Sequence, residues 1–513
     1  MSFCTVLSAA VQGLSVEMIR VEADVSNGLP MFHMVGYLSS EVKEASERVR
    51  TAIRNSGMKL PAKKIIVNLA PATVRKRGAS FDLPIALAVL AAMNYVPEEA
   101  LKGVAVIGEV SLEGKIRGVS GVLPIVMEAK NQGCTVCILP EENEIEGRLV
   151  SGIKILPADN LEKLCAYLNG DEKEIHRKKQ GRSSAQRNIF ENKKEDFSDI
   201  CGQNAVKRAA EIAVAGGHNL LMAGPPGSGK SMIARRIATI LPELSLEESL
   251  EITRIYSVLG MIDKEQPLIT RRPFRSVHHT ITKTALVGGG MTPRPGEISM
   301  AHGGVLFLDE LAEFPRNVLE VLRQPLEERK ITVTRVSGNY EFPADFMMVA
   351  AMNLCPCGFY PDRNRCNCSE NQIRRYLGHI SRPILERFDI CAQASPVTFG
   401  ELNPAQGENE DSASIRKRVE HARTRQERRF SGTRIRFNSR MGMKEVELHC
   451  GLGAEAKDFA QRIYESGGFS ARRYHKALKV ARTIADLEDS KDIKKEHLAE
   501  ALGYGGLEEK IWG

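Results

Sequence analysis

The hydrophobic and polar positions of the N-terminal third of the chain alternate between two patterns. Short apolar runs, of the kind that fill buried strands, occur at residues 64–69 and 104–107, and residues 40–56 have the spacing of a helix. Strand-like and helix-like segments in alternation are typical of α/β domains. The pattern therefore predicts a mixed α/β domain over residues 1–170.

A second α/β domain is predicted for residues 197–396. Its apolar runs at 220–223, 305–308 and 346–352 are short and continuous, which indicates buried strands. The remaining residues, 397–513, are predicted to be helical.

The segments between these regions are polar. In residues 171–196, fourteen of 26 residues are charged and several others are Gly or Ser, which is typical of a linker. The polar stretch 403–414 is predicted to be a loop. The chain has 513 residues, 42% hydrophobic and 26% charged, so it has the length of two to four domains and the composition of a globular protein.

The sequence predicts a cytoplasmic protein with no membrane partner. Residues 81–96 are apolar but contain Asp82, Pro84 and Asn94, so they fall short of the roughly 18 uncharged apolar residues of a membrane span. The N-terminus has no Lys or Arg before Arg20 and therefore lacks the positive region of a signal peptide.

One motif directly after the apolar run 220–223 indicates a phosphate-binding loop. It fills the pattern G-x-x-x-x-G-K-[ST] with Gly224, Pro225, Pro226, Gly227, Ser228, Gly229, Lys230 and Ser231. The glycines let backbone N–H groups cradle phosphate oxygens, the lysine reaches the outer phosphates, and the serine binds Mg²⁺. The sequence therefore predicts ATP and Mg²⁺ as cofactors.

Polar residues at the ends of two other buried runs complete the predicted site. Residues 305–308 are followed by Asp309, expected to bind Mg²⁺, and by Glu310, expected to act as the base on the attacking water. Residues 346–352 are followed by Asn353, an amide placed to hydrogen-bond the γ-phosphate or the water.

These motifs, in this order, resemble an AAA+ ATPase. Residues 272–279 (RPFRSVHH), 288–290 (GGG) and 295–299 (PGEIS) resemble the Mg-chelatase-like ComM/YifB branch, and the match spans nearly the whole chain. The resemblance implies a parallel-sheet P-loop domain with a C-terminal helical lid over 397–513. It also implies an ATP-dependent homo-oligomeric ring, a hexamer.

The resemblance assigns two arginines. Arg387 matches the arginine finger that a subunit supplies to the ATP of its neighbour, and Arg472 matches the sensor-2 arginine of the lid. Arg473 stands where the family usually has a glycine. The alternative for each is a surface ion pair.

Two segments are candidates for the ring pore. Residues 269–300 are predicted to be an insertion on the ATPase core that points toward the pore. Residues 331–342 have a hairpin pattern around Ser337-Gly338, which places Arg335 and Asn339 near the tip, where a cation would contact DNA phosphates. His278 and His279 are expected to lie on opposite faces of a strand, in a structural or pore role.

Four clustered cysteines indicate a metal site. Cys355, Cys357, Cys366 and Cys368 have the spacing C-x-C-x8-C-x-C and can converge on one structural Zn²⁺ held by four thiolates. The alternative is reduced free thiols, because one residue between paired cysteines is fewer than the usual two to four.

Positive charge is concentrated in one part of the C-terminal region. Residues 416–440 contain ten Lys or Arg against Glu420 and Glu427, whereas the whole chain has a net charge of +7. Such a density suits a polyanion such as DNA, and the alternative is a solvated helix.

The N-terminal domain resembles the proteolytic domain of Lon. The resemblance rests on residues 108–114 and 138–143, and it places Ser80 at the nucleophile and Leu123 at the lysine that serves as its base. A serine without a base is a weak nucleophile, so the domain is predicted to be inactive. Lys115 and Lys130 flank the lysine position.

The leading hypothesis is therefore a Mg²⁺-dependent AAA+ ATPase ring that moves single-stranded or branched DNA. The ComM resemblance implies a branch-migration helicase in recombination or natural transformation. Alternatives are a magnesium chelatase-type motor, a protein-remodelling ATPase and an ATP-dependent protease.

Overall fold

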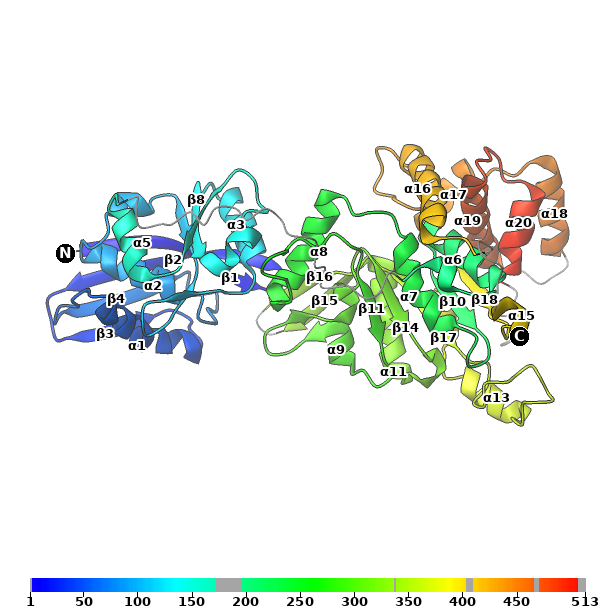
Figure 1. The fold of residues 1–513 in the computed structure, drawn as a ribbon, viewed down its shortest axis with the longest axis horizontal. Helices are drawn as coiled ribbons and strands as arrows, with labels where there is room; N and C mark the ends of the chain where they lie inside the picture. The colour runs from blue at the N-terminus through cyan, green and yellow to red at the C-terminus, as the bar shows by residue number, and fades with distance from the viewer. Residues whose placement is uncertain (1, 172–194, 336–337, 403–408, 466–469, 506–513) are drawn as a thin grey trace.

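The computed structural model describes residues 2–171, 195–335, 338–402, 409–465 and 470–505. An N-terminal sheet domain and a central sheet domain follow one another along the longest axis of the molecule, and the C-terminal helices lie beside the half of the central domain that is farther from the N-terminal domain (Figure 1). Most of the predicted linker, 171–196, lies outside the described residues, as does the first half, 403–408, of the predicted loop. The prediction of a loop over 403–414 is wrong at its end, because a helix begins at Ser412.

The N-terminal domain is built on a mixed sheet of seven strands in the order β3-β4-β2-β1-β5-β8-β9. The strands are β1 (Ser2–Gln12), β2 (Ser15–Ser26), β3 (Met31–Val35), β4 (Lys64–Ala70), β5 (Val104–Val106), β8 (Val136–Pro140) and β9 (Lys154–Ala158). The principal helices are α1 (Ser40–Asn55), α2 (Asp82–Ala92), α3 (Val122–Asn131), α4 (Glu144–Gly147) and α5 (Leu161–Leu168).

Helices cover both faces of this sheet. Successive side chains of a strand point to opposite faces, so Val6 and Ala10 of β1 share a core with α1, α2 and α5, whereas Ala9 packs with α3. Every residue of α2 is buried. The apolar run 81–96 is therefore a core helix, and no helix among the described residues has the length and hydrophobicity that a membrane span requires.

The central domain contains a five-stranded parallel sheet in the order β11-β14-β17-β10-β18. Its strands are β10 (Leu220–Ala223), β11 (Phe274–Val277), β14 (Val305–Leu308), β17 (Met347–Met352) and β18 (Ile390–Gln393). The main helices are α6 (Asn204–Gly216), α7 (Lys230–Ile240), α8 (Leu246–Leu259), α13 (Glu370–Leu377) and α14 (Arg382–Leu385). The sequence prediction of an α/β domain here is confirmed.

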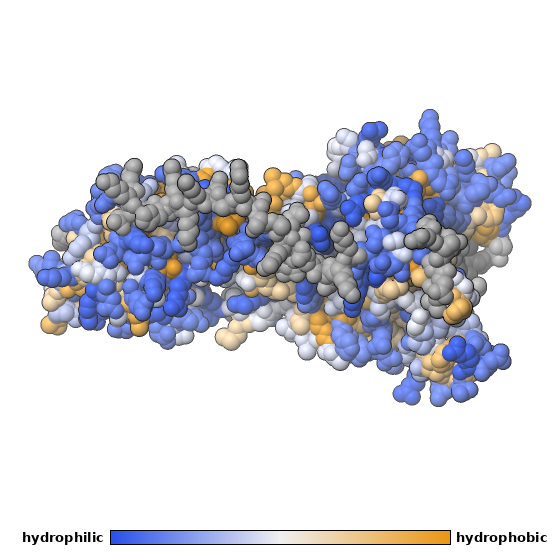
Figure 2. All heavy atoms as spheres, in the orientation of Figure 1, coloured by the Kyte–Doolittle hydropathy of each residue, from blue (hydrophilic) through white to orange (hydrophobic). Residues whose placement is uncertain are grey.

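The C-terminal helices share a core with one face of this sheet. They are α16 (Ser412–Arg429), α17 (Met443–His449), α18 (Ala454–Glu465), α19 (Ala471–Leu487) and α20 (Lys495–Gly503). Leu220 of β10 packs in one hydrophobic cluster with α6, α7 and residues of this lid, whereas its neighbour Leu221 faces the opposite cluster. The hydrophobic core of these C-terminal helices is therefore continuous with that of the central domain. The face shown in Figure 2 is mainly hydrophilic, with scattered hydrophobic residues.

The predicted insertion, 269–300, is only partly extra structure. Residues 274–277 form β11, which pairs in parallel with β14 as an edge strand of the core sheet. The added part follows it as α9 (Lys283–Val287), the short pair β12 (Gly288–Gly289) and β13 (Arg294–Pro295), and α10 (Glu297–Met300).

A buried carboxylate joins the N-terminal domain to the central domain. Glu146 Oε1 accepts hydrogen bonds from the Leu123 N–H at 2.8 Å and from the Ser257 hydroxyl of α8 at 2.6 Å. Burial raises the pKa of Glu146. Next to it, the Gly121 N–H donates to the Ser257 carbonyl at 2.9 Å, so α3 and α8 are fixed end to end.

Two substitutions of Glu146 should distinguish the contribution of its hydrogen bonds to stability from the cost of burying its charge. Glu146→Gln keeps an acceptor oxygen and removes a charge that burial disfavours, so its melting temperature at pH 8 should equal or exceed that of the wild type. Glu146→Ala leaves two buried donors without their acceptor and should cost about 1–3 kcal/mol of stability.

The pH dependence gives a second readout by calorimetry. Burial raises the pKa of Glu146 in the folded state, so the protonated carboxyl favours folding. The wild type should therefore lose stability as pH rises from the unfolded pKa of a glutamate, about 4.3, through the folded value. The glutamine variant should lack that loss. Equal melting temperatures for Glu146→Ala and the wild type would contradict the role of this contact.

Candidate functional site

The phosphate-binding loop lies between β10 and α7, as the sequence predicts. It turns through Gly227 and Gly229, whose φ angles of +77° and +82° lie in the left-handed region. Glycine adopts these angles without a steric penalty. Helix α7 begins at Lys230 and is fixed from below by buried Ile233 and Ile237, so its N-terminus faces the space enclosed by the loop.

The Lys230 ammonium is held inside this loop. Its Nζ donates to the carbonyl oxygens of Gly224 and Pro225, both at 2.8 Å, and to Oδ1 of Asn353 at 3.3 Å. Burial lowers the pKa of Lys230 to about 8. Phosphate oxygens would offset this burial by favouring the charged ammonium, so the site suits an anion.

Ser231 and Asp309 have the chemistry and spacing for Mg²⁺. Asp309 follows β14, and its Oδ2 accepts a hydrogen bond of 2.7 Å from Ser231 Oγ. Neighbouring oxygens around Mg²⁺ lie about 2.9 Å apart when Mg–O distances are about 2.0–2.1 Å. The structure therefore brings together Lys230, Ser231, Asp309 and Asn353 from the ends of three adjacent parallel strands.

Glu310 contacts a histidine that sequence reasoning did not assign to this site. Glu310 has a φ of +53°, and its Oε2 lies 3.2 Å from Nδ1 of His279. The expectation that His278 and His279 lie on opposite faces of a strand is wrong, because both follow the end of β11 and their rings are 4.0 Å apart. Val277 pairs with Leu308, and that register places His279 level with Glu310.

Arg387 and Arg472 lie at the opposite edge of the sheet. Arg387 precedes β18, and its carbonyl accepts a hydrogen bond of 2.8 Å from Asn219, which precedes β10. The phosphate-binding loop follows the other end of β10, four residues or about 13 Å away at about 3.3 Å per residue. The parallel direction of the strands therefore separates these arginines from the Lys230 of the same chain.

The two arginines line one cavity of about 350 Å³. Arg387 pairs with Glu327, and Arg472 Nη1 lies 2.5 Å from Oε2 of Glu386. Burial, and then the positive charge of Arg472, lowers the pKa of Arg387. Both guanidiniums are thus gathered on one face and paired with glutamates.

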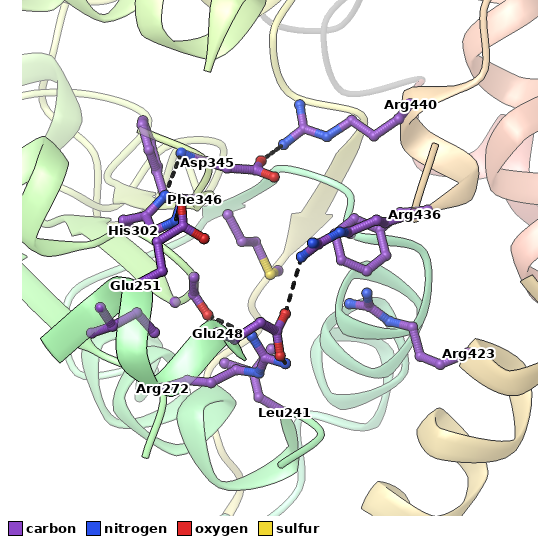
Figure 3. A pocket seen from close by; sticks show the side chains of 16 residues that line it. Leu241, Glu248, Glu251, Arg272, His302, Asp345, Phe346, Arg423, Arg436 and Arg440 are labelled. Atoms are coloured by element: carbon purple, nitrogen blue, oxygen red, sulfur yellow. Dashed lines mark hydrogen bonds and ion pairs between the residues drawn. The ribbon is translucent and has the colours of Figure 1, made fainter. Parts of the chain in front are cut away.

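A second cavity at this edge, of about 220 Å³, lies where the ATPase sheet meets the lid (Figure 3). Arg423 of α16 stacks 3.7 Å from the centre of the Phe437 ring. Each carboxylate on the wall has a basic partner: Arg272–Glu248 at 3.1 Å, Arg440–Asp345 at 2.6 Å and His302–Glu251 at 3.3 Å. The cavity is therefore an ion-paired seam between the domain and its lid.

This seam changes the interpretation of the basic segment 416–440. Seven of its ten cations contact carboxylates, carbonyls or a ring of the protein itself: Arg416, Arg418, Arg423, Arg425, Arg429, Arg436 and Arg440. Most of the positive charge of this segment is therefore engaged in contacts within the lid or between the lid and the central domain, which weakens its interpretation as a DNA surface. Most of the partners of these arginines come from distant parts of the chain, so the charge balance of residues 416–440 alone does not include them.

The predicted hairpin forms as β15 (Lys330–Arg335) and β16 (Gly338–Pro343). Its turn, 336–337, lies outside the described residues. Asn339 pairs with Thr334 in the ladder, and Arg335 Nε donates to the Gly290 carbonyl at 3.4 Å. The two predicted pore elements thus touch each other.

The four cysteines converge, as the sequence predicts for zinc. The Sγ atoms of Cys355, Cys357 and Cys366 lie 3.4 to 3.7 Å apart, and those of all four, including Cys368, lie within 4.8 Å of one another. Thiolates around a tetrahedral Zn²⁺ lie about 3.8 Å apart when Zn–S is about 2.3 Å. The cluster therefore fits one structural zinc ion.

This cysteine loop rests on the phosphate-binding loop. A Cβ at Gly358 would lie 2.6 Å from Cδ of Pro226, so only glycine fits there. The backbone N–H of Phe359 lowers the pKa of Cys357 to about 6, which supplies a thiolate at this loop.

The residues expected from the Lon resemblance do not form a base and nucleophile pair. Leu123 is buried and presents its backbone N–H to Glu146. Lys115 pairs with Glu113 at 2.9 Å in an exposed position, and Lys130 lies against Gly152. The two flanking lysines thus contact other residues, and the inactivity of the domain stays a prediction.

Family models of the magnesium chelatase ChlI subunit match three parts of the chain. "Magnesium chelatase, subunit ChlI" matches residues 196–402, "Subunit ChlI of Mg-chelatase" residues 21–143, and "Magnesium chelatase, subunit ChlI C-terminal" residues 409–505. The three matches together cover most of the chain.

Relatives match over nearly the full length. Competence protein ComM of Haemophilus influenzae is 42% identical over 514 residues, which is 99% of this chain and 98% of that protein. YifB of Escherichia coli is 42% identical over 508 residues with the same coverage. Lon protease 2 of Bacillus subtilis is 28% identical over 197 residues, 33% of this chain and 35% of that protein.

The cysteine cluster predicts zinc content. Elemental analysis after dialysis against a weak chelator should find about one zinc per chain, because four thiolates fill the tetrahedral shell. Cys355→Ser and Cys366→Ser, which remove the two buried sulfurs, should lose it. Cys201→Ser, outside the cluster, is the matched control and should keep it. Zinc-free wild type, or full zinc in Cys355→Ser, would contradict the assignment.

Proposed function

The chain belongs to the magnesium chelatase ChlI family, whose ComM and YifB members match it from end to end, and from this premise we propose that it is an ATP-driven ring that moves DNA. As a magnesium chelatase-like AAA+ ATPase, it hydrolyses ATP. The finer proposal is a branch-migration helicase. Because the Haemophilus relative is named a competence protein, we place the step in recombination during natural transformation.

One observation carries the ring proposal: the catalytic groups of one chain lie at two opposite edges of its sheet. Lys230 lies at the carboxyl edge, whereas Arg387 and Arg472 lie at the amino edge in one cavity. A second subunit that presents its amino edge to the first would complete the site with both arginines. We propose that six subunits joined in this way close a ring, with ATP bound between neighbours.

Within such a site, each residue has a role that its contacts support. Lys230 would exchange its two carbonyl contacts for phosphate oxygens, and Asn353 would orient the γ-phosphate or the water. Ser231 and Asp309 would hold Mg²⁺, which neutralises charge on the phosphates. Glu310 would accept the proton of the attacking water, and Arg387 of the neighbour would stabilise the transferring group.

Two contacting elements support DNA as the substrate. The hairpin β15–β16 carries exposed Arg335, which touches the turn between β12 and β13, and that turn bears Met291, 84% exposed. A cation beside an exposed apolar side chain suits the backbone and bases of a single strand.

The alternatives are a chelatase-type motor that inserts Mg²⁺ into a porphyrin-like ring and a protein-remodelling ATPase. Both share the ATPase core, so the core does not discriminate among them. The response of ATP turnover to DNA discriminates among the three functions.

ATP hydrolysis should rise several-fold when a branched DNA is added to the purified protein. Glu310→Gln should abolish turnover with and without DNA, which controls for contaminating activity. Arg335→Ala should weaken stimulation because it removes a phosphate contact, whereas Lys330→Ala at the base of the same hairpin, where Lys330 pairs with Glu341, should not. Turnover that depends on Glu310 but ignores DNA would favour the alternatives.

Mixing two inactive variants should restore activity if the arginine acts between subunits. Lys230→Ala lacks the phosphate site and Arg387→Ala lacks the finger, whose removal lowers turnover roughly 10³-fold or more. In a mixed ring, an Arg387→Ala subunit keeps its phosphate site and receives an intact finger from a Lys230→Ala neighbour. ATPase assays of the mixture should exceed the sum of the separate variants. A mixture no more active than its components would place Arg387 outside the neighbour's site.

A further inference from the structure

The wall of the cavity between the central domain and the lid carries more guanidinium than carboxylate groups. Its charged members are Arg272, Arg423, Arg436 and Arg440 against Glu248, Glu251 and Asp345, and His302 pairs with Glu251. Glu248 serves two arginines, since it lies 3.1 Å from Arg272 and 3.4 Å from Arg436. Asp345 lies 2.6 Å from Arg440. The carboxylates of the wall therefore do not neutralise all of its arginines.

Arg423 is the arginine that the carboxylates leave over. Its Nη2 donates to the Val214 carbonyl at 2.5 Å, and its guanidinium stacks 3.7 Å from the centre of the Phe437 ring. Among the described residues, no carboxylate lies within ion-pair distance of it. The Nε atoms of Arg423 and Arg440 are both buried, and no described residue offers either of them a hydrogen-bond acceptor. Two buried donors on the wall of this cavity thus lack acceptors.

Burial and like charges together lower the pKa of two arginines at this seam. Burial, and then the positive charge of Arg272, lowers the pKa of Arg423 to about 9. Arg329 lies 3.9 Å from Asp345, the carboxylate that Arg440 also contacts. Burial, and then the charge of Arg440, lowers the pKa of Arg329. An anion in the cavity would favour the charged guanidiniums and so offset these effects.

The cavity lies at the end of the sheet opposite the phosphate-binding loop. Gly217, Gly303 and Asp345, which line it, precede β10, β14 and β17. Arg423 and Arg436 extend into it from the lid, toward the central domain (Figure 3). An anion bound here would therefore contact both the central domain and the lid, and it would be separate from the phosphates held at Lys230.

The size and chemistry of the cavity select a small oxyanion. Its volume of about 220 Å³ corresponds to roughly seven water molecules at about 30 Å³ each. That space accommodates one phosphate group with a few waters. Guanidinium groups match phosphate oxygens with two parallel N–H···O bonds, a geometry that a single ammonium cannot supply.

We propose that this cavity is a second anion site, which binds a phosphate dianion and fastens the lid to the central domain. The phosphate is either free inorganic phosphate or the phosphate group of a mononucleotide. The site depends neither on DNA nor on the ring, so its failure would leave the proposed function untouched.

The test titrates inorganic phosphate into full-length Lys230→Ala, a variant that lacks the lysine of the phosphate-binding loop. Isothermal titration calorimetry at constant ionic strength, balanced with chloride, should find saturable binding of one phosphate per chain. Adding Arg423→Gln should weaken that binding about tenfold or more, because a charge-assisted hydrogen bond is lost. Arg428→Gln removes the same charge from an exposed position of the same helix and should leave the affinity unchanged.

Thermal unfolding gives a second readout of the same variants. Because phosphate would bind only the folded state, it should raise the melting temperature of Lys230→Ala with or without Arg428→Gln. The variant with Arg423→Gln should show no rise. Where Arg423→Gln fails to fold in chloride, Arg436→Gln replaces it, since Arg436 is 58% exposed and the core does not need it. Arg436→Gln should weaken phosphate binding several-fold.

A parallel titration with AMP distinguishes the two sources of the phosphate. Binding of AMP at least as tight as that of phosphate supports the site as one for a mononucleotide, and binding of phosphate alone supports it as one for the free ion. Lys230→Ala that binds neither overturns the proposal. Equal affinities with Arg423→Gln and with Arg428→Gln also overturn it, as does unchanged affinity with Arg436→Gln where that variant is the one tested.

Discussion

The direction of the five parallel strands is the constraint on which the rest of the structure depends. Because all five strands run the same way, the residues that follow them meet at one edge and the residues that precede them meet at the other. Lys230, Asp309 and Asn353 follow strands, whereas Arg387 precedes one. Rotation of side chains does not reverse this arrangement, so the two groups of residues lie on two separate faces of the molecule.

Other segments of the molecule also contact the predicted phosphate site at the carboxyl edge of the sheet. The cysteine loop follows Asn353 and rests on Pro226, so a bound zinc ion would stiffen the floor of the phosphate site. His279 follows β11 and reaches Glu310. Ser257, in the last turn of α8, donates to the buried Glu146 of the N-terminal domain. A short sheet thus connects the phosphate-binding loop, the cysteine loop, the segment that follows β11 and the N-terminal domain.

The charged residues show why counting along the chain was a poor guide to the surface. The basic segment 416–440 looked like a polyanion surface, yet Arg429 pairs with buried Asp486 at 2.5 Å and Arg418 pairs with Glu211 at 2.6 Å. Both acids are distant in sequence. A buried charge needs a partner to offset its desolvation penalty, so Arg429 stabilises the lid and Arg418 joins the lid to α6 of the central domain. Exposed Arg335, a single charge with no composition signal, remains the better candidate for a DNA contact.

The sequence by itself determined the local chemistry. A P-loop needs glycine at Gly227 and Gly229, the acids must follow an apolar run, and C-x-C pairs can converge on a metal. Each of these requirements concerns residues that are neighbours in the chain. Only the tertiary structure decided which distant groups meet. It placed β11 in the sheet, which set His279 against Glu310. It also placed Arg387 and Arg472 together at the far edge. Those outcomes depend on strand order and register, which arise from packing between segments far apart in the chain rather than from any local pattern.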